Sequence, residues 1–192
     1  MKIPRPQSRQ PIPQHAELKF KGVLFDTYQW EQSMYDGSTK TFEKIKRADC
    51  AVVIAITTDK KILISKQMQP GRSEFYGFFG GMMEDGEDPL EAAQRELLEE
   101  SGYSSDRCEL WFAGQPSSKI DSAWYDFVFR DCVKVADQKL DGGEKIEVLE
   151  VEFDEFLKIV LRDDFFEMEV KLRIMKMLIK SQKEELRDFL LG

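Results

Sequence analysis

The chain has 192 residues and a mass of 22.4 kDa, the size of one ordinary domain with its own core. Hydrophobic residues make up 42% and charged residues 33%, and no apolar run approaches the roughly 20 residues of a membrane helix. The formal net charge of -8 would repel a nucleic-acid backbone, and no Lys/Arg cluster interleaved with aromatic residues offsets it. We therefore expect a soluble protein that binds neither membranes nor polymeric nucleic acid.

Nothing in the sequence directs the chain out of the cell. The basic start lacks the apolar stretch and small-residue cleavage site of a secretory signal. Three cysteines, Cys50, Cys108 and Cys132, have no C-x-x-C spacing and indicate neither a disulfide framework nor a zinc site. We expect them to pack as small apolar residues in a cytoplasmic protein.

The N-terminal region divides into an arm and the start of a domain. Residues 1–16 contain four prolines, which suit neither sheet nor helix, so we expect an extended arm before a single domain at residues 17–192. Residues 17–47 predict an antiparallel β-hairpin, since two strand-like runs flank the turn signal Asp36-Gly37. The first run, which includes Tyr28 and Trp30, is read as one strand.

The remainder of the chain alternates strands with one central helix and ends in helices. Strands are predicted at residues 51–57, 62–67, 109–113, 124–130 and 146–153. A short helix with Asp154 as its N-cap should reach about residue 161, and a longer one should cover residues 166–190. This order favours an α/β (α+β) fold with helices packed on a mixed sheet.

The central helix has clear end signals. Asp88 is a suitable N-cap, Pro89 occupies the first helical position, Glu91 completes a capping box, and Gly102 is a suitable C-terminal stop. A glycine cluster at residues 77–81 precedes this helix and allows its backbone to approach a ligand closely.

Three carboxylates share one side of this helix. At about 100° per residue, Glu96 and Glu100 lie one above the other and Glu99 lies beside them. Arg95 cannot neutralise all three, and clustered oxygen ligands without His or Cys are the preference of magnesium or manganese. The alternative for these residues alone is a solvated acidic helix face.

Residues 81–103 decide between these alternatives. They read Gly, five residues, Glu, seven residues, Arg-Glu-aliphatic-any-Glu-Glu-any-Gly-apolar, and so resemble the box of the Nudix hydrolase superfamily at every fixed position. Tyr103 is the one soft departure, because an aliphatic residue is usual there. The resemblance implies a Nudix-type α-β-α sandwich, a mixed β-sheet with helices on both faces, behind the N-terminal antiparallel β-hairpin. It also implies two or three Mg²⁺ ions, with Mn²⁺ as an alternative, bound at a diphosphate.

The resemblance assigns roles residue by residue. It implies metal ligands at Gly80, Glu96, Glu99 and Glu100, ligand-orienting and loop-bracing roles at Gly81, Glu87 and Arg95, and catalytic roles at Glu99, Arg95 and Glu144. Glu144, in a late Asp-Gly-Gly-Glu segment, stands where such enzymes position or deprotonate the attacking water. Its alternative is a solvated turn residue.

Outside the box, residues near Arg47, residues 67–70, Pro116 and the Glu144 segment resemble the ADP-ribose and nucleoside diphosphate-sugar pyrophosphatases. Gln69 departs from that branch, because an arginine that grips phosphate is expected there. Substrate-binding candidates are Arg47, Tyr28, Trp30, Gln69, Ser118 and Asp121. Ordinary strand packing remains the alternative for Arg47, Tyr28 and Trp30.

The expected function is Mg²⁺-dependent cleavage of ADP-ribose or a related nucleoside diphosphate sugar into a nucleoside monophosphate and a sugar phosphate. The alternatives are hydrolysis of nucleoside triphosphates or dinucleoside polyphosphates, house-cleaning of an oxidised nucleotide, and a Nudix domain that senses a nucleotide sugar without cutting it. By the same resemblance we expect a homodimer with residues 17–47 at its interface.

Overall fold

The computed structural model describes residues 3–115 and 117–192. The strands are β1 (Glu17–Lys21), β2 (Asp26–Ser33), β3 (Thr39–Lys46), β4 (Cys50–Thr57), β5 (Ile62–Met68), β6 (Phe75–Gly77), β7 (Phe79–Met82), β8 (Tyr103–Ser104), β9 (Arg107–Gly114), β10 (Ile120–Asp121), β11 (Trp124–Lys134) and β12 (Lys145–Val151). The helices are α1 (Pro89–Ser101), α2 (Phe153–Val160), α3 (Met168–Ile179) and α4 (Lys183–Leu191). None of the helices described is long and apolar enough to cross a membrane.

The main sheet is mixed, as the sequence predicts. Its strands follow the order β12-β5-β4-β11-β8, with β6 paired to β5, β7 to β4 and β9 to β11. Strands β4 and β11 run parallel, whereas the other pairs are antiparallel. The parallel pair lies at the centre of the sheet, where both faces are covered, which explains the nearly continuous apolar sequence of β4.

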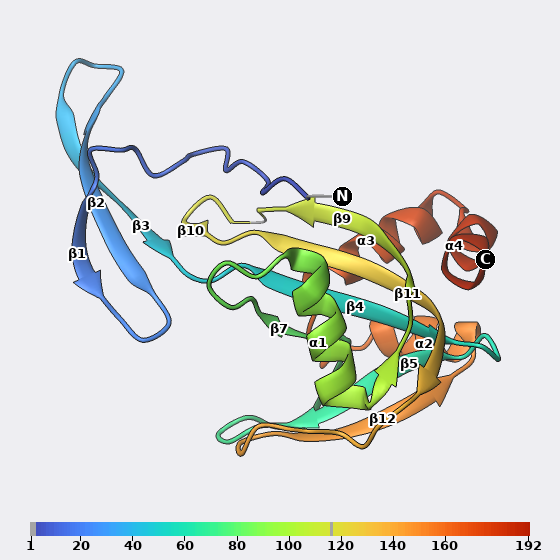
Figure 1. Ribbon diagram of the computed structural model, residues 1–192. Helices are drawn as coiled ribbons and strands as arrows, with labels where there is room; N and C mark the ends of the chain where they lie inside the picture. Colours follow the sequence, from blue (N-terminus) through green and yellow to red (C-terminus); the bar gives the residue numbers. More distant parts are fainter. Residues whose placement is uncertain (1–2, 116) are drawn as a thin grey trace.

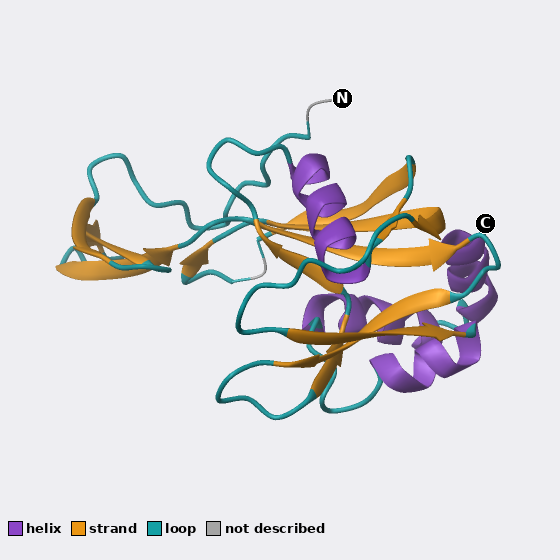
Figure 2. Ribbon diagram, turned by 60° about the horizontal axis from the view of Figure 1, so that its bottom comes forward, coloured by secondary structure: helices purple, strands orange, loops and turns teal. Residues whose placement is uncertain are grey.

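Alternate residues of β4 face two different helical layers. Ala51, Val53 and Ala55 belong to the apolar cluster that includes Leu97 of α1, whereas Val52, Ile54 and Ile56 pack with residues of α2, α3 and α4. Successive side chains of a strand point to opposite faces, so this one strand supports both layers. Figure 2 shows α1 on one side of the sheet and the remaining helices on the other. The predicted α-β-α sandwich is therefore confirmed.

A second, smaller sheet stands beside the main body (Figure 1). Its order is β1-β2-β3-β10, and β2 and β3 form the predicted hairpin, with Gly37 at φ 81° in the turn. The reading of the first run as one strand is wrong: the Gly22 amide donates to the Phe25 carbonyl at 3.0 Å, and this turn separates β1 from β2. The division into an arm at residues 1–16 and one domain at residues 17–192 stays a prediction.

The C-terminal helices differ from expectation in two places. Helix α2 begins at Phe153 after Glu152, and Asp154 lies in its first turn, where it pairs with Lys183 at 2.7 Å instead of capping the helix. The predicted long helix is two helices, because Ser181 adopts a positive φ of 59° between α3 and α4. This break lets α4 fold back, with Leu186 and Leu190 buried in the core.

Helix α1 has the ends that the sequence predicts. The Asp88 carboxylate accepts a hydrogen bond from the Leu90 amide at 3.0 Å, and the Glu91 carboxylate accepts one from the Asp88 amide at 3.3 Å. Gly102 ends the helix in the left-handed conformation at φ 75°, and a Cβ there would lie 2.1 Å from the Ala136 carbonyl oxygen. Both ends are thus fixed, which sets the position of every side chain along the helix.

We predict that Asp88→Ala lowers the free energy of unfolding by about 1 kcal/mol, because the backbone amides of Leu90 and Glu91 lose the carboxylate that caps them. Urea denaturation followed by circular dichroism measures this loss. Asp85→Ala, which removes an exposed carboxylate from the same loop, is the control and should change the midpoint much less. Equal midpoints for the two variants would contradict the capping role.

Candidate active site

A cavity of about 400 Å³ opens along the side of α1 that carries the carboxylates. Helix α1, strand β7, the start of β4 and the loop before β12 form most of its wall. Its lining includes Arg47, Cys50, Gln69, Gly80, Gly81, Met82, Glu84, Arg95, Glu96, Glu99, Glu100, Trp124, Lys139, Asp141, Glu144 and Phe166. The structure therefore brings the predicted metal ligands and Glu144 to one cavity, although they are far apart in the sequence.

Arg95 is the centre of an ion-pair network in this wall. Its guanidinium forms two bonds to Glu87, from Nε at 2.8 Å and from Nη2 at 3.0 Å, and it also contacts Glu96 at 2.8 Å and Glu99 at 3.3 Å through Nη1. The Glu87 carboxylate also accepts a bond from the Glu84 amide at 2.8 Å, and Arg95 lowers the pKa of Glu87. Arg95 and Glu87 thus connect the loop before α1 to the helix, while their role in orienting metal ligands stays a prediction.

Glu100 is the most deeply buried carboxylate of the wall, with 6% of its surface exposed. Burial raises its pKa to about 9, although the hydrogen bond from the Gly80 amide at 2.8 Å opposes this shift, and repulsion from Glu96 and Glu144 adds to it. Burial also raises the pKa of Glu96. The anionic forms of these groups therefore need a nearby positive charge that Arg95 alone does not supply.

Two glycines allow this packing. A Cβ on Gly81 would lie 2.5 Å from Oε1 of Glu96, so any side chain there would displace that carboxylate. Gly80 has φ 152°, and a Cβ on it would lie 2.3 Å from the Ala51 carbonyl oxygen. The backbone of β7 can therefore lie directly between β4 and the acidic side of α1.

The donor set fits a hard divalent cation. Glu96, Glu99 and Glu100 are all-oxygen ligands on one wall, and Gly80 lies beside them, which is the chemistry that Mg²⁺ and Mn²⁺ prefer. Within the described residues, no three His, Cys, Asp or Glu side chains are grouped closely enough to hold a metal ion. Glu96 and Glu99 instead contact Arg95, and Glu100 contacts Gly80. The residue types fit, while their metal-binding role stays a prediction.

The loop before β12 lines the same cavity. The Glu144 amide donates to the Asp141 carbonyl at 2.9 Å, and burial together with Asp141 raises the pKa of the Glu144 carboxyl. The Lys139 amide donates to the Glu99 carbonyl at 2.8 Å, which ties the same loop to the end of α1. Glu144 is thus half-buried in the cavity rather than a freely solvated turn residue, although its catalytic role stays a prediction.

Two of the six substrate-binding candidates line the cavity, and the other four do not. Arg47 and Gln69 line the cavity, and the guanidinium of Arg47 lies 5.7 Å from the ring centroid of Phe25. Their place suits contact with a ligand, while that role stays a prediction.

The other four candidates lie elsewhere. Tyr28 is on β2, and Trp30 of the same strand is buried 6.0 Å from the ring of Phe42. Ser118 lines a separate hollow, and the Asp121 carboxylate pairs with Arg5 at 3.0 Å. None of these four lines the cavity in this chain, so contact with a substrate bound there requires a second copy or a rearrangement.

Several residues of the site carry no signal in the sequence. Trp124 and Phe166 lie on the cavity wall because β11 pairs with β4 and the α2–α3 connection bonds to Tyr76 of β6, which no local pattern indicates. Glu167 is buried at the start of α3, where its carboxylate accepts a hydrogen bond from the Phe78 amide at 3.1 Å and lies 3.1 Å from the position of a Cβ on Gly77. Glu167 thereby supports the backbone that leads into β7. Pro116 lies outside the described residues.

We predict that Glu167→Gln makes the protein more stable at pH 8 but not at pH 5. Burial raises the pKa of Glu167 from 4.5 to about 8, so the folded carboxyl keeps its proton while the unfolded one loses it. Wild-type stability therefore falls as pH rises through this window, by an amount on the order of a few kcal/mol, and glutamine avoids this cost. Urea titrations at both pH values measure the difference.

The exposed carboxylate of Glu184 on α4 supplies the control for this experiment. Glu184→Gln should shift the urea midpoint equally at pH 5 and pH 8. If Glu167→Gln behaves in the same way, the buried acid does not contribute to the pH dependence of stability.

Comparisons with known proteins show the family of the chain and its fold. Residues 46–169 match the family model described as NUDIX domain. An ADP-ribose pyrophosphatase of Bacillus subtilis (strain 168) is 27% identical over 168 residues, which cover 86% of this chain and 91% of that protein. A methanol dehydrogenase activator of Bacillus methanolicus is 29% identical over 149 residues, 76% of this chain and 80% of that protein.

A solved structure described as an ADP compounds hydrolase matches with a TM-score of 0.71 and 19% identity, covering 92% of this chain and 97% of that one. This likeness shows the fold. Because the matched family model spans more than half of the sequence, the chain belongs to the NUDIX domain family. It is a Nudix hydrolase, and it resembles the ADP-ribose pyrophosphatase branch.

Proposed function

We propose that this protein is a Mg²⁺-dependent pyrophosphohydrolase that cuts ADP-ribose or a related nucleoside diphosphate sugar into a nucleoside monophosphate and a sugar phosphate. The observation that carries the proposal is a single cavity lined by Glu96, Glu99, Glu100 and Glu144. The similarity to an ADP-ribose pyrophosphatase over 86% of the chain supports the substrate class.

The chemistry requires a cation between the wall and the substrate. A diphosphate would meet several carboxylates in the cavity, and among the described lining residues the positive side chains are Arg47, Arg95 and Lys139. Glu96, Glu99, Glu100 and the carbonyl of Gly80 would hold Mg²⁺, or Mn²⁺ in its place. Bound divalent ions spread the charge of phosphoryl oxygens and lower the pKa of water.

The protein side chains act around this centre. Arg95 orients Glu96 and Glu99 through its ion pairs, and Arg47, which also lines the cavity, would contact the substrate. Glu144 would accept the proton of the attacking water. The water oxygen bonds to one phosphorus while the bridging P–O bond breaks, and the second phosphate leaves with the bridging oxygen.

A second candidate is a Nudix domain that binds a nucleotide sugar and acts through a partner protein. The similarity to a methanol dehydrogenase activator supports it, since that relative carries an activator's name at 29% identity. Nucleoside triphosphates and dinucleoside polyphosphates remain alternative substrates, and Gln69 leaves the cavity without an arginine at that position.

We predict turnover of at least one member of a nucleotide-sugar panel in the presence of Mg²⁺, and a loss of about a hundred-fold or more in kcat for Glu100→Gln, because a buried ligand carboxylate is neutralised. Ion-exchange chromatography of the products identifies the substrate and the bond that is cut. Circular dichroism checks that the variant remains folded.

Glu91→Gln is the matched control, since it makes the same chemical change on the exposed side of the same helix, and glutamine can also complete a capping box. Its kcat should stay within about twofold of the wild type. Thermal stabilisation by a nucleotide sugar without any product would favour the sensing function over hydrolysis. Hydrolysis of triphosphates alone would replace the proposed substrate class.

We also propose a homodimer formed through the small sheet. Apolar side chains are exposed on β1 and on the turn that follows it: Leu18, Phe20, Val23, Leu24 and Phe25. Val23 is fully exposed, at 101% of its reference area. A group of neighbouring exposed apolar residues is unusual on the surface of a monomer. A second copy covering these residues could also bring Tyr28 or Trp30 near the partner's cavity.

The doubly charged variant Phe20→Glu/Val23→Glu should sediment as a monomer at micromolar concentration, where we expect the wild type to sediment as a dimer. Charges in a desolvated contact oppose association. Val135→Glu changes another exposed valine, on the main body, and should leave the dimer intact. A wild-type protein that sediments as a monomer would remove the dimer proposal.

The cytoplasm remains the proposed location. Cys50, Cys108 and Cys132 are all free thiols in the structure, and two of them are buried. Unpaired cysteines suit a reducing compartment.

A further inference from the structure

The N-terminal arm is bound along the body of the molecule rather than free of it. Figure 1 shows it running from the small sheet across the β9–β10 connection. We propose that Arg5 of this arm is a positioning residue. Its ion pairs with Asp49 and Asp121 form a clamp that holds the segment contributing Arg47 and Cys50 to the cavity wall. The proposal concerns the same site as the proposed function, and its kinetic test rests on that function.

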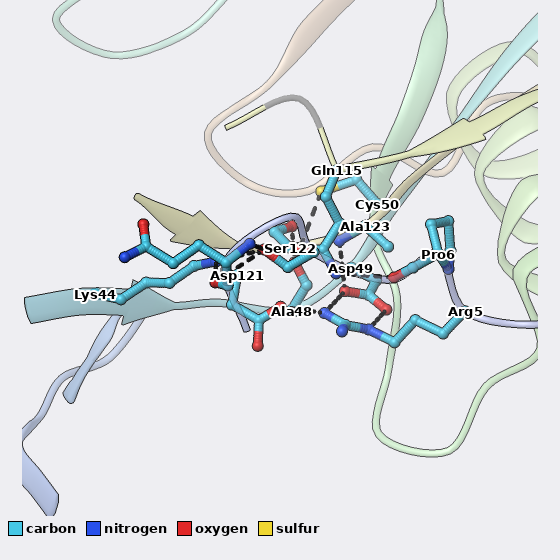
Figure 3. A network of polar contacts seen from close by, with 12 residues as sticks. Arg5, Pro6, Lys44, Ala48, Asp49, Cys50, Gln115, Asp121, Ser122 and Ala123 are labelled. Carbon is cyan, nitrogen blue, oxygen red and sulfur yellow. Dashed lines mark hydrogen bonds and ion pairs between the residues drawn. The ribbon is translucent and has the colours of Figure 1, made fainter. Parts of the chain in front are cut away.

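Arg5 bridges two carboxylates that are distant in sequence (Figure 3). Its Nε donates to Oδ2 of Asp49 at 2.7 Å, and its Nη2 donates to Oδ1 of Asp49 at 2.9 Å and to Oδ1 of Asp121 at 3.0 Å. The Asp49 and Asp121 side chains are 17% and 15% exposed, so both are largely shielded from water. A planar guanidinium suits this two-acid geometry, which an ammonium cannot reproduce.

Asp49 connects the arm to two further segments. Its Oδ1 accepts a hydrogen bond from the Ala123 amide at 2.8 Å, at the start of β11. Its carbonyl oxygen accepts one from the Met83 amide at 2.8 Å, in the loop that follows β7. One residue therefore joins the arm, the central parallel strand and the entry to the acidic helix.

The residues on either side of Asp49 line the cavity. Arg47 and Cys50 both belong to its wall. The Arg47 amide donates to the Asp121 carbonyl at 3.2 Å, and the Cys50 amide donates to the Ala123 carbonyl at 2.9 Å. Asp49 and Asp121, the two acids that Arg5 bonds, thus lie in the two segments whose backbone hydrogen bonds position Arg47 and Cys50.

The rest of the arm reinforces this arrangement. Gln115 donates from Nε2 to the Pro6 carbonyl at 2.9 Å, next to the β9–β10 connection. Lys44 of β3 is 2% exposed, and its ammonium donates to Ser8 Oγ and to the Gln10 carbonyl, both at 2.7 Å. A buried ammonium needs such partners, so the arm also ties the small sheet to the body.

Loss of the Arg5 guanidinium would leave Asp49 and Asp121 as two shielded like charges without their shared partner. Their repulsion would separate the segment at residues 47–50 from the segment at residues 121–123, and Arg47 would move with it. The acidic wall on α1 keeps its own bonds to Arg95 and Gly80. Substrate binding should therefore weaken while the chemical step is largely kept.

The experiment uses the full chain and compares Arg5→Ala, Arg5→Lys and Arg9→Ala. Arg9 lies in the same arm and lines a hollow separate from the cavity, so its removal is a matched control for charge. We expect Arg5→Ala to raise KM about tenfold with kcat within about twofold. Lysine should restore only part of this loss, and Arg9→Ala should keep the wild-type KM.

Amide hydrogen exchange gives a second readout that does not need hydrolysis. In Arg5→Ala the amides of Ala123 and Met83, which donate to Asp49, should exchange about tenfold or more faster than in the wild type, while amides of α2 stay unchanged. Asp121→Asn, which keeps the Asp49 fork, should show a smaller increase. This variant also tests the clamp if Arg5→Ala does not fold.

Unchanged exchange at Ala123 and Met83 in Arg5→Ala would overturn the proposal, as would a uniform increase over the whole chain, which indicates only general destabilisation. If exchange becomes faster at Ala123 and Met83 but KM is unchanged, Arg5 has only a structural role, and the positioning role is overturned. If the wild type hydrolyses no nucleotide sugar, the proposed function fails, and the affinity for ADP measured by calorimetry replaces KM in the comparison.

Discussion

Several carboxylates lie close together on the partly buried side of one helix, and much of the structure serves to hold them there. Burial and mutual repulsion raise the pKa of Glu100 and Glu96, and such an arrangement costs folding free energy unless cations compensate it. Arg95 supplies one positive charge within the protein. The remaining imbalance is the physical reason for the proposal that this wall binds divalent ions and, through them, the oxygens of a diphosphate.

Each supporting element fixes one aspect of the position of these carboxylates. The capping box and Gly102 fix the ends of α1, Leu97 anchors it on β4, and the absence of a side chain at Gly81 leaves room for the carboxylate of Glu96. Because β4 packs on both faces, α1 and the three C-terminal helices are placed relative to the same strand. The cavity is therefore bounded by elements that cannot shift independently.

A second set of acidic residues extends this order to the segments around Arg47 and β7. The Asp49 carboxylate accepts hydrogen bonds from Arg5 of the arm, and the Asp49 backbone carbonyl accepts one from the Met83 amide of the Nudix box. The Glu167 carboxyl accepts one from the Phe78 amide, just before β7. Each acid is shielded from water and bonded to a backbone amide of another element. The charged pair of Arg5 and Asp49, together with these bonds from backbone amides, holds segments at defined distances where apolar packing alone permits small displacements.

The sequence by itself determined the helix α1, its carboxylate spacing, the central strands and the family, because caps, helical periodicity and β-branched runs act within a few residues. The tertiary structure alone decided which distant residues come together: Glu144 in the same cavity as Glu100, Glu167 against Gly77, and Arg5 between Asp49 and Asp121. It also split the first predicted strand at Gly22 and the last predicted helix at Ser181. Such contacts follow from the packing of whole elements, which local patterns do not encode.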